Sequence, residues 1–349
     1  MHFAMTLKKR NRILDNSLTK KKTMPGNPAK TFLLFFSLLT IALTSVMLSL
    51  QLGSIHISTE QLWQILNGSD HGMEARIVSE LRWPRIATAF VTGSLLALSG
   101  VLMQVLLRNP LADPYILGIS GGAATAALFA ISIGISSIWL QPVTLAGAAI
   151  AMLLVYFFAR LGARQGNSPL LLTGVILAAG WGALINLLLI LADNHTVHAM
   201  LFWLMGDLSY AGRVQSWHLL LLIFAGVIAW WFGRDLNLLL LGEAKAFTLG
   251  SPVKRVRIIA YSLAAMCTAT AVSLAGTVGF IGLIIPHMMR KLTGSDHRLL
   301  IPASVLAGGS LLTIADMGAR TFMSPQQLPV GVITAMLGVP IFLYLLIRR

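Results

Sequence analysis

The chain has 349 residues, of which 56% are hydrophobic and only 11% are charged. Ordinary soluble domains carry about 25% charged residues, so this composition excludes a typical soluble enzyme, and its apolar content also excludes a disordered chain. Lys and Arg (26) outnumber Asp and Glu (12), which gives a formal net charge of +14. A basic excess can indicate nucleic acid or a membrane surface as partner, and here the apolar content favours the membrane.

Stretches of about 20 mainly apolar residues, the length that spans a bilayer as a helix, recur along the chain. The sequence therefore predicts an all-α polytopic membrane protein with about ten transmembrane helices. In chain order, the expected spans are residues 31–52, 86–107, 114–134, 139–159, 169–192, 214–232, 258–275, 277–289, 299–318 and 328–347. A basic leader, residues 1–30, precedes the first span, which is longer than a signal-peptide core and ends without a small-residue cleavage site. We expect this span to be retained.

The distribution of charge predicts the topology. Ten spans place both termini on one side, and if that side is the cytoplasm, 21 of the 26 basic residues lie inside, as the positive-inside rule requires. The excess positive charge is then explained by the orientation of the chain in the membrane and by a basic inner surface. We therefore expect no nucleic-acid partner. The five basic residues outside are Arg76, Arg82, Arg85, Arg213 and Arg320.

Groups that could drive transport or catalysis are not evident. Ion-coupled transporters usually carry an ionisable residue deep in the membrane, and the first seven spans contain no Asp, Glu, Lys or Arg. No Gly is followed by Lys, so a Walker A loop is absent, and Cys267 is the only cysteine. We therefore expect no catalytic residue, metal site or cofactor in this chain. A secondary transporter of a bulky small molecule remains an alternative function.

Glycine patterns mark two features of the spans. Small or polar residues follow one another at four-residue intervals in span 169–192, on one helix face, and predict either close helix packing or a smooth wall facing a translocation pathway or a second copy. They are Gly174, Ala178, Gly182 and Asn186. In addition, Gly and Pro interrupt spans 114–134 and 277–289. If spans two to five and seven to ten form an inverted repeat, these broken spans correspond, which is typical of a transport pathway.

Four groups of residues carry a family resemblance. They are Leu81-Arg82-Trp83-Pro84-Arg85 with Ser99-Gly100 and Gln104; residues 108–114 with Leu117-Gly118; Leu241-Gly242-Glu243 with Ala246 and Leu249-Gly250; and residues 279–283, Pro286-His287, Arg290, Asp296-His297-Arg298, Ala315-Asp316, Arg320 and residues 328–331. With these motifs the chain resembles the ABC importer permeases for iron-siderophore, haem and cobalamin uptake. Trp83 and Gln327 depart from the family pattern, which usually has a smaller apolar residue and a Glu there.

The resemblance implies a permease domain over residues 31–349, embedded in the lipid of the cell inner (cytoplasmic) membrane. It implies a dimer, formed with an identical copy or with a paralogue. ATP-binding-cassette ATPase subunits would dock on the inner face, and a periplasmic or lipid-anchored substrate-binding protein would deliver a metal chelate to the outer face. Iron-siderophore, haem and cobalamin all remain open as the cargo.

The resemblance also suggests residue roles. A coupling helix that contacts the ATPase would lie in the inner loop 233–257, where Glu243 suits a helix N-terminus and Gly250 can end the helix; a simple interfacial turn is the alternative. The residues concerned are Leu241, Gly242, Glu243, Ala246, Leu249 and Gly250. Outside, Arg82, Arg85 and Arg320 would pair with carboxylates of the binding protein, because guanidinium groups form two-pronged bonds to carboxylates. Snorkelling toward lipid phosphate is the alternative for these arginines.

Overall fold

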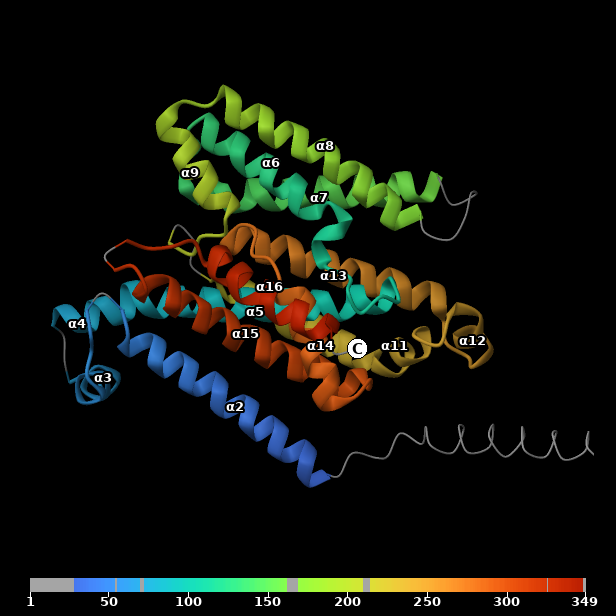
Figure 1. Cartoon of the computed structure of the whole chain (residues 1–349), viewed down its shortest axis with the longest axis horizontal. Coiled ribbons are helices and arrows are strands. Elements are labelled where there is room, and N and C mark those ends of the chain that lie inside the picture. The colour runs from blue at the N-terminus through green and yellow to red at the C-terminus, as the bar shows by residue number, and fades with distance from the viewer. Residues whose placement is uncertain are drawn as a thin grey trace, which may run out of the picture. The chain divides into compact units, whose positions relative to one another are not determined.

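The computed structural model describes residues 28–53, 55–69, 72–161, 169–209, 214–324 and 326–347, and these residues form helices joined by loops, without a strand (Figure 1). The all-α prediction is confirmed. Most of the basic leader lies outside the described residues. The elements are α2 (Pro28–Gln51), α3 (Thr59–Leu66), α4 (Met73–Arg76), the π-helical turn η1 (Ile77–Arg82), α5 (Trp83–Leu106), the 3-10 turn η2 (Pro114–Leu117), α6 (Ile119–Ser132), α7 (Ser137–Leu161), α8 (Pro169–Leu191), α9 (Asn194–Leu204), α10 (Ser216–Trp231), α11 (Gly233–Leu239), α12 (Glu243–Thr248), α13 (Val253–Ala275), α14 (Ile281–Thr293), α15 (His297–Thr321) and α16 (Val330–Ile347).

The helices are those of a multi-pass membrane protein. Among the described residues, six helices are long and apolar enough to cross a bilayer, and a seventh crossing results if α10 and α11, which bend by 61° at their junction, count as one span. Each of the ten expected spans coincides with a helix. However, α6, α14 and α16 have 14, 13 and 18 residues, fewer than the about 20 that span a bilayer. The count of ten therefore stays a prediction.

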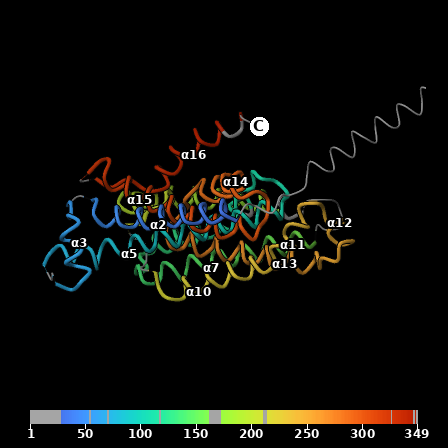
Figure 2. Tube along the Cα trace, turned by 90° about the horizontal axis from the view of Figure 1, so that it is seen from below, coloured from blue at the N-terminus to red at the C-terminus, as the bar shows by residue number. Residues whose placement is uncertain are grey.

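The chain divides into two compact units, Met1–Thr40 and Ile41–Arg349. Within the first, the structure describes residues 28–40, the N-terminal part of α2. All contacts discussed below belong to the second unit. In this unit α3 and α12 lie at opposite ends of the long helices α5 and α13 (Figures 1 and 2). The predicted topology makes the α3 end the outer side and the α12 end the inner side.

Helix α5 forms the core of the second unit. In the membrane-length window of the helix Met73–Leu106, 89% of residues are buried, and α5 packs against α13, α14 and α15. Small polar side chains on α5 bond to backbone carbonyls of these neighbours: Ser94 Oγ donates to Val305 O (3.0 Å) and Gln104 Nε2 donates to Leu283 O (3.1 Å). Such bonds satisfy polar groups in an apolar surrounding and hold helices together.

Glycines allow α5 to approach its neighbours at backbone distance. A Cβ atom at Gly100 would overlap the carbonyl oxygen of Gly282 in α14, and a Cβ atom at Gly93 would overlap that of Gly308 in α15. Gly282 also lies against the ring of Pro114 at the start of η2. Small residues at helix contacts therefore set the spacing of the core.

Replacing Gly100 with Ala is expected to lower the free energy of unfolding by about 1–3 kcal/mol, because the added methyl group pushes backbone against backbone in a filled core. Gly226→Ala in α10 is the matched control, since a Cβ atom there meets no heavy atom of the described residues within 4 Å. Thermal unfolding of the purified full chain measures both. Equal midpoints for the two variants would contradict the close contact of α5 with α14.

The two interrupted spans meet in the structure. Gly118, with φ +70°, separates η2 from α6, and residues 276–280 separate α13 from α14. The Tyr115 hydroxyl joins the two breaks, donating to Val278 O (3.0 Å) and accepting from the Val278 N–H (3.2 Å). The predicted breaks are thus confirmed, while the inverted repeat stays a prediction.

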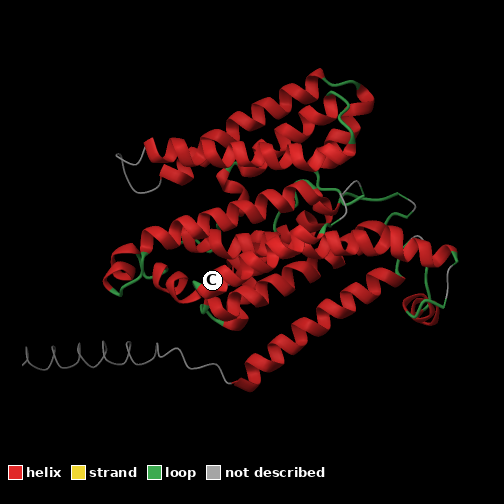
Figure 3. Cartoon of the chain, turned by 180° about the vertical axis from the view of Figure 1, so that it is seen from behind, coloured by secondary structure: helices red, strands yellow, loops and turns green. Residues whose placement is uncertain are grey.

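Helices α6, α7, α8 and α9 form a second group beside α13 (Figures 1 and 3). Gly122 of α6 and Gly147 of α7 allow a close approach inside this group, since a Cβ atom on either would come within 2.7 Å of the other's carbonyl oxygen. Only 6% of the membrane-length window of α8 is buried. Most of α8 therefore faces lipid or another subunit.

Candidate docking sites at the two ends of the helices

A single carboxylate organises the arginines at the outer end. Asp316, in α15, is fully buried. Its Oδ1 and Oδ2 accept hydrogen bonds from Arg85 Nε at 2.9 and 3.1 Å, and Arg85 Nη2 lies 2.8 Å from Oδ1. Arg320, four residues later in the same helix, places its Nε 3.1 Å from Oδ2. We call Arg82, Arg85, Asp316 and Arg320 the outer arginine cluster; it carries one negative and three positive charges.

Arg82 bonds to backbone instead of a carboxylate. Its guanidinium donates to the carbonyl oxygens of Leu50 (2.5 Å) and Gln51 (3.0 Å), the last residues of α2, and to that of Ile55 in the following loop. The last carbonyls of a helix lack partners within the helix and carry partial negative charge, so Arg82 caps α2. Arg320 extends the same contact, with Nη2 donating to Ser49 Oγ at 2.5 Å.

The outward edge of the cluster belongs to Arg85. Its Nη1 donates to Gln327 Oε1 (2.6 Å) and to Ser209 Oγ (3.1 Å). Arg85 is 12% exposed, more than Arg320 at 8%. Gln327 is a neutral acceptor, so Asp316 is the only carboxylate among the described residues that pairs with Arg85. The cluster thus keeps an excess of positive charge close to the outer surface.

The structure brings the three predicted arginines together but buries more of them than the sequence suggested. The organising role of Asp316 was not predicted, although its four-residue spacing from Arg320 is an ion-pair signal within a helix. Ser49, Ser209 and Gln327 were not predicted as partners of the arginines either. They lie in other parts of the chain, so no local pattern marks them.

At the inner end, the predicted helix is present as α12. It begins at Glu243 after Gly242, which has φ +104°, and ends before Gly250, which has φ +83°. The Gly250 N–H bonds to Phe247 O (3.0 Å) and the Ser251 N–H to Ala246 O (3.0 Å), the arrangement with which a left-handed glycine closes a helix. Helix formation by this loop is therefore confirmed, including its start and its glycine end.

The side chains of α12 point in two directions. Ala246 is completely buried, whereas Phe247 is 75% exposed, and Leu241 and Leu249 on either side are each 56% exposed. The Glu243 carboxylate pairs with Arg257 Nη1 at 2.9 Å, which ties α12 to α13. Ala246 thus anchors the helix from within, and the exposed apolar surface is formed by Leu241, Phe247 and Leu249. Phe247 was not among the predicted residues. An aromatic residue in a polar inner loop could have indicated a contact surface there.

The small-residue face of α8 does not make one continuous contact. Gly174 and Ala178 lie against Gly118, since a Cβ atom on Gly118 would come within 3.2 Å of Gly174 O and 3.4 Å of Ala178 N. A Cβ atom on Gly182 would meet no heavy atom of the described residues within 4 Å, and Asn186 is exposed. The first half of the face therefore packs within the chain, and the second half is open.

Comparison with known proteins decides the family. The sequence profile of the FecCD transport family matches residues 39–348. The chain belongs to this family. The match contains the outer arginine cluster, α12 and the small-residue face of α8, so the predicted resemblance is confirmed over nearly the whole length.

Family members with known roles are similar over most of their length. The chain is 41% identical over 279 residues to the cobalamin import system permease protein BtuC of Halobacterium salinarum, covering 78% of this chain and 74% of that protein. It is 39% identical over 319 residues to the Fe(3+) dicitrate transport system permease protein FecD of Escherichia coli, covering 89% and 97%. Among solved structures, a metal-chelate type ABC transporter in an inward-facing conformation superimposes with a TM-score of 0.79 at 30% identity, covering 91% of this chain and 100% of that one.

Proposed function

We propose that the chain is the permease subunit of an ATP-binding-cassette importer that carries a metal chelate across the cytoplasmic membrane. The match to FecCD permeases over residues 39–348 carries this proposal, together with relatives whose names specify cobalamin and ferric dicitrate import. ATP hydrolysis would belong to separate subunits. The chelate is a metal complex of the iron-siderophore, haem or cobalamin kind.

The inner partner is an ATPase subunit that receives α12. The exposed apolar residues Leu241, Phe247 and Leu249 offer a hydrophobic contact at the inner end, and aromatic residues such as Phe are enriched in protein interfaces. Burial of Ala246 and the Glu243–Arg257 pair hold this surface in place. In this proposal Gly242 and Gly250 serve by fixing the ends of the helix.

The outer partner is a substrate-binding protein with acidic residues. Three arginines share one carboxylate in the outer arginine cluster, and this excess positive charge attracts carboxylates on an approaching partner. Arg85 is the contact residue, because its Nη1 edge faces the exposed Ser209 and Gln327 side chains. Arg82 and Arg320 add to the field while bonded to α2.

A second permease copy, identical or paralogous, would complete the pathway. The second half of the α8 small-residue face, at Gly182 and Asn186, is open to such a partner. Close approach of two helices through small residues needs no polar groups and suits an apolar wall. Such a wall fits the passage of a bulky chelate.

Transport into liposomes tests the proposed function. The permease, co-expressed with its ATPase and reconstituted, should take up one of cobalamin, ferric dicitrate or haem only when ATP and the loaded binding protein are both supplied. An ATPase variant without hydrolytic activity is the control. Uptake driven by a proton or sodium gradient without ATP would contradict the proposal and support a secondary transporter.

Replacing Arg85 with Gln is expected to weaken docking of the binding protein by about tenfold, equivalent to about 1.4 kcal/mol, and to reduce the salt dependence of docking. Arg76→Gln is the matched control, since Arg76 is an exposed outer arginine outside the cluster. Surface plasmon resonance on the reconstituted complex measures both properties. The same affinity and salt dependence in the two variants would exclude Arg85 as a docking residue.

A further inference from the structure

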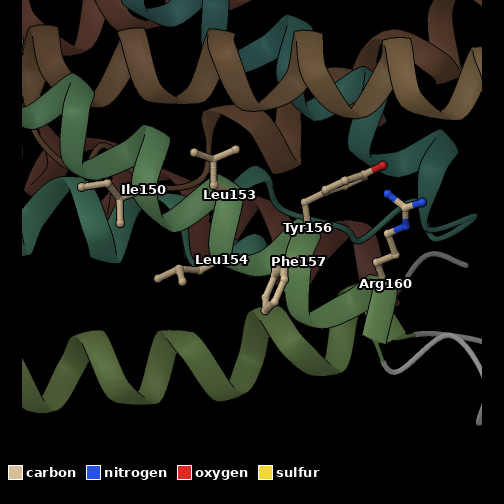
Figure 4. A pocket seen from close by; sticks show the side chains of 6 residues that line it. All are labelled: Ile150, Leu153, Leu154, Tyr156, Phe157 and Arg160. Carbon is tan, nitrogen blue, oxygen red and sulfur yellow. The ribbon is translucent and has the colours of Figure 1, made fainter.

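An apolar groove runs along α7 on the surface of the second unit. Its cavity has a volume of about 510 Å³ and is lined by Ile150, Leu153, Leu154, Tyr156, Phe157 and Arg160 (Figure 4). These residues all belong to α7, and Leu153 and Phe157 are exposed. The groove is therefore open to the surroundings of the helix bundle along its length.

A second hollow adjoins the groove at Ile150. It has a volume of about 300 Å³ and lies between α6, α7 and α8, with Ile150 and Trp181 among its lining residues. Ile150 lines both hollows. Gly122 and Trp181 also line this second hollow, and the two hollows form one track with Ile150 in common.

The charge on this track is confined to one end. Of the residues that line the two hollows, Arg160 alone is charged, and the ion pairs formed among the described residues do not include it. The Tyr156 hydroxyl and the Arg160 guanidinium lie together at that end of the groove (Figure 4). The end of α7 that carries Arg160 is on the same side as α12 (Figures 1 and 3), which is the inner side.

The dimensions match one leaflet of a bilayer. Ten residues separate Ile150 from Arg160, and at a rise of 1.5 Å per residue they span about 15 Å. Half of a hydrocarbon core of about 30 Å is the same length. An acyl chain that starts at the level of Arg160 would thus reach the membrane centre at Ile150. By contrast, α8 is also exposed and apolar but contains no charged residue that could hold a headgroup.

We propose that the α7 groove binds an anionic phospholipid of the inner leaflet. The acyl chain lies along Ile150, Leu153 and Phe157, and the phosphate accepts hydrogen bonds from the Arg160 guanidinium and the Tyr156 hydroxyl. Guanidinium groups bind phosphate through two parallel bonds, and basic residues on the cytoplasmic side of membrane helices select anionic headgroups. This site is separate from the docking surfaces proposed at α12 and at the outer arginine cluster.

Native mass spectrometry of the purified full chain tests the site with defined lipids. With phosphatidylglycerol as probe, the wild-type chain should retain one lipid, at higher occupancy than with phosphatidylcholine. Arg160→Gln should weaken phosphatidylglycerol binding by about fivefold, the factor expected for one basic residue at the surface. Arg255→Gln, at an exposed inner arginine of α13, is the matched control and should bind like the wild type.

Two results would overturn the proposal. The first is a lipid-binding result without selectivity: the wild type retains both lipids equally, or the Arg160 and Arg255 variants retain phosphatidylglycerol equally. The second is evidence that another copy of the chain occupies the groove. Leu153→Cys detects this, because Cys267 is the only native cysteine and is buried. A disulfide-linked dimer formed by oxidation in membranes would assign the groove to a protein interface, whereas a cross-link-free chain agrees with lipid.

Discussion

Replacing Phe247 with Asp is expected to lower ATP-dependent uptake by at least about tenfold while leaving the permease folded. Phe247 is 75% exposed on α12, so the permease itself loses little packing when the ring is removed. Truncating an aromatic hot-spot residue costs about 2 kcal/mol or more in binding, and a buried carboxylate adds a desolvation cost. Uptake into liposomes and co-purification of the ATPase measure the effect.

Phe322→Asp is the matched control for this prediction. Phe322 is also 75% exposed but follows α15 at the outer end, so its replacement should preserve ATPase co-purification. Ala246→Asp should behave differently from both, because Ala246 is fully buried and the substitution unfolds α12 as well as uncoupling transport. Normal uptake and ATPase binding by Phe247→Asp would show that α12 does not couple the two subunits.

Replacing Asp316 with Asn is expected to lower the free energy of unfolding by about 3 kcal/mol. Asp316 is buried and balances both Arg85 and Arg320, and removing one partner of a buried ion pair leaves uncompensated charge at a cost of about 3–5 kcal/mol. The amide keeps the size and one acceptor oxygen, so the loss reports charge more than packing. Thermal or denaturant unfolding of the full chain measures it.

Asp193→Asn serves as the matched control, since Asp193 is an exposed outer carboxylate whose side chain makes no capping bond to α9. Its replacement should change stability by less than about 0.5 kcal/mol. The double variant of Asp316→Asn with Arg85→Gln should recover part of the loss, because it removes one of the two unbalanced cations. If the double variant is less stable than Asp316→Asn alone, charge balance is not what Asp316 contributes.

Sequence reasoning located the helices and the ends of α12 because both leave local signals. Apolar stretches show where helices cross the membrane, and Gly242 and Gly250 have the positive φ angles that glycine adopts most readily. The central position of α5 left no such signal. Span 86–107 of α5 and span 169–192 of α8 both lack charged residues, so composition does not separate the buried α5 from the exposed α8.

The partners of the outer arginines were also beyond sequence reasoning. Arg82 bonds to carbonyls of Leu50 and Gln51, and backbone groups are present at every position whatever the side chain. Asp316 and Arg85 are joined across more than two hundred residues. The family resemblance placed the arginines in one region. That Arg85 and Arg320 share the Asp316 carboxylate follows from the packing of α5 against α15, which the sequence does not show.

The contact of Gly282 with both Gly100 and Pro114 joins three segments of the second unit into one block. Because backbone touches backbone there, α5, η2 and the start of α14 must shift together, and Tyr115 locks the same block to the loop before α14. By contrast, only 6% of the membrane-length window of α8 is buried, and its Trp181 packs against Gly121 through a side chain. This block should therefore move as one unit when a pathway opens or closes, and among the membrane-length helices amide hydrogen exchange should be slowest in α5.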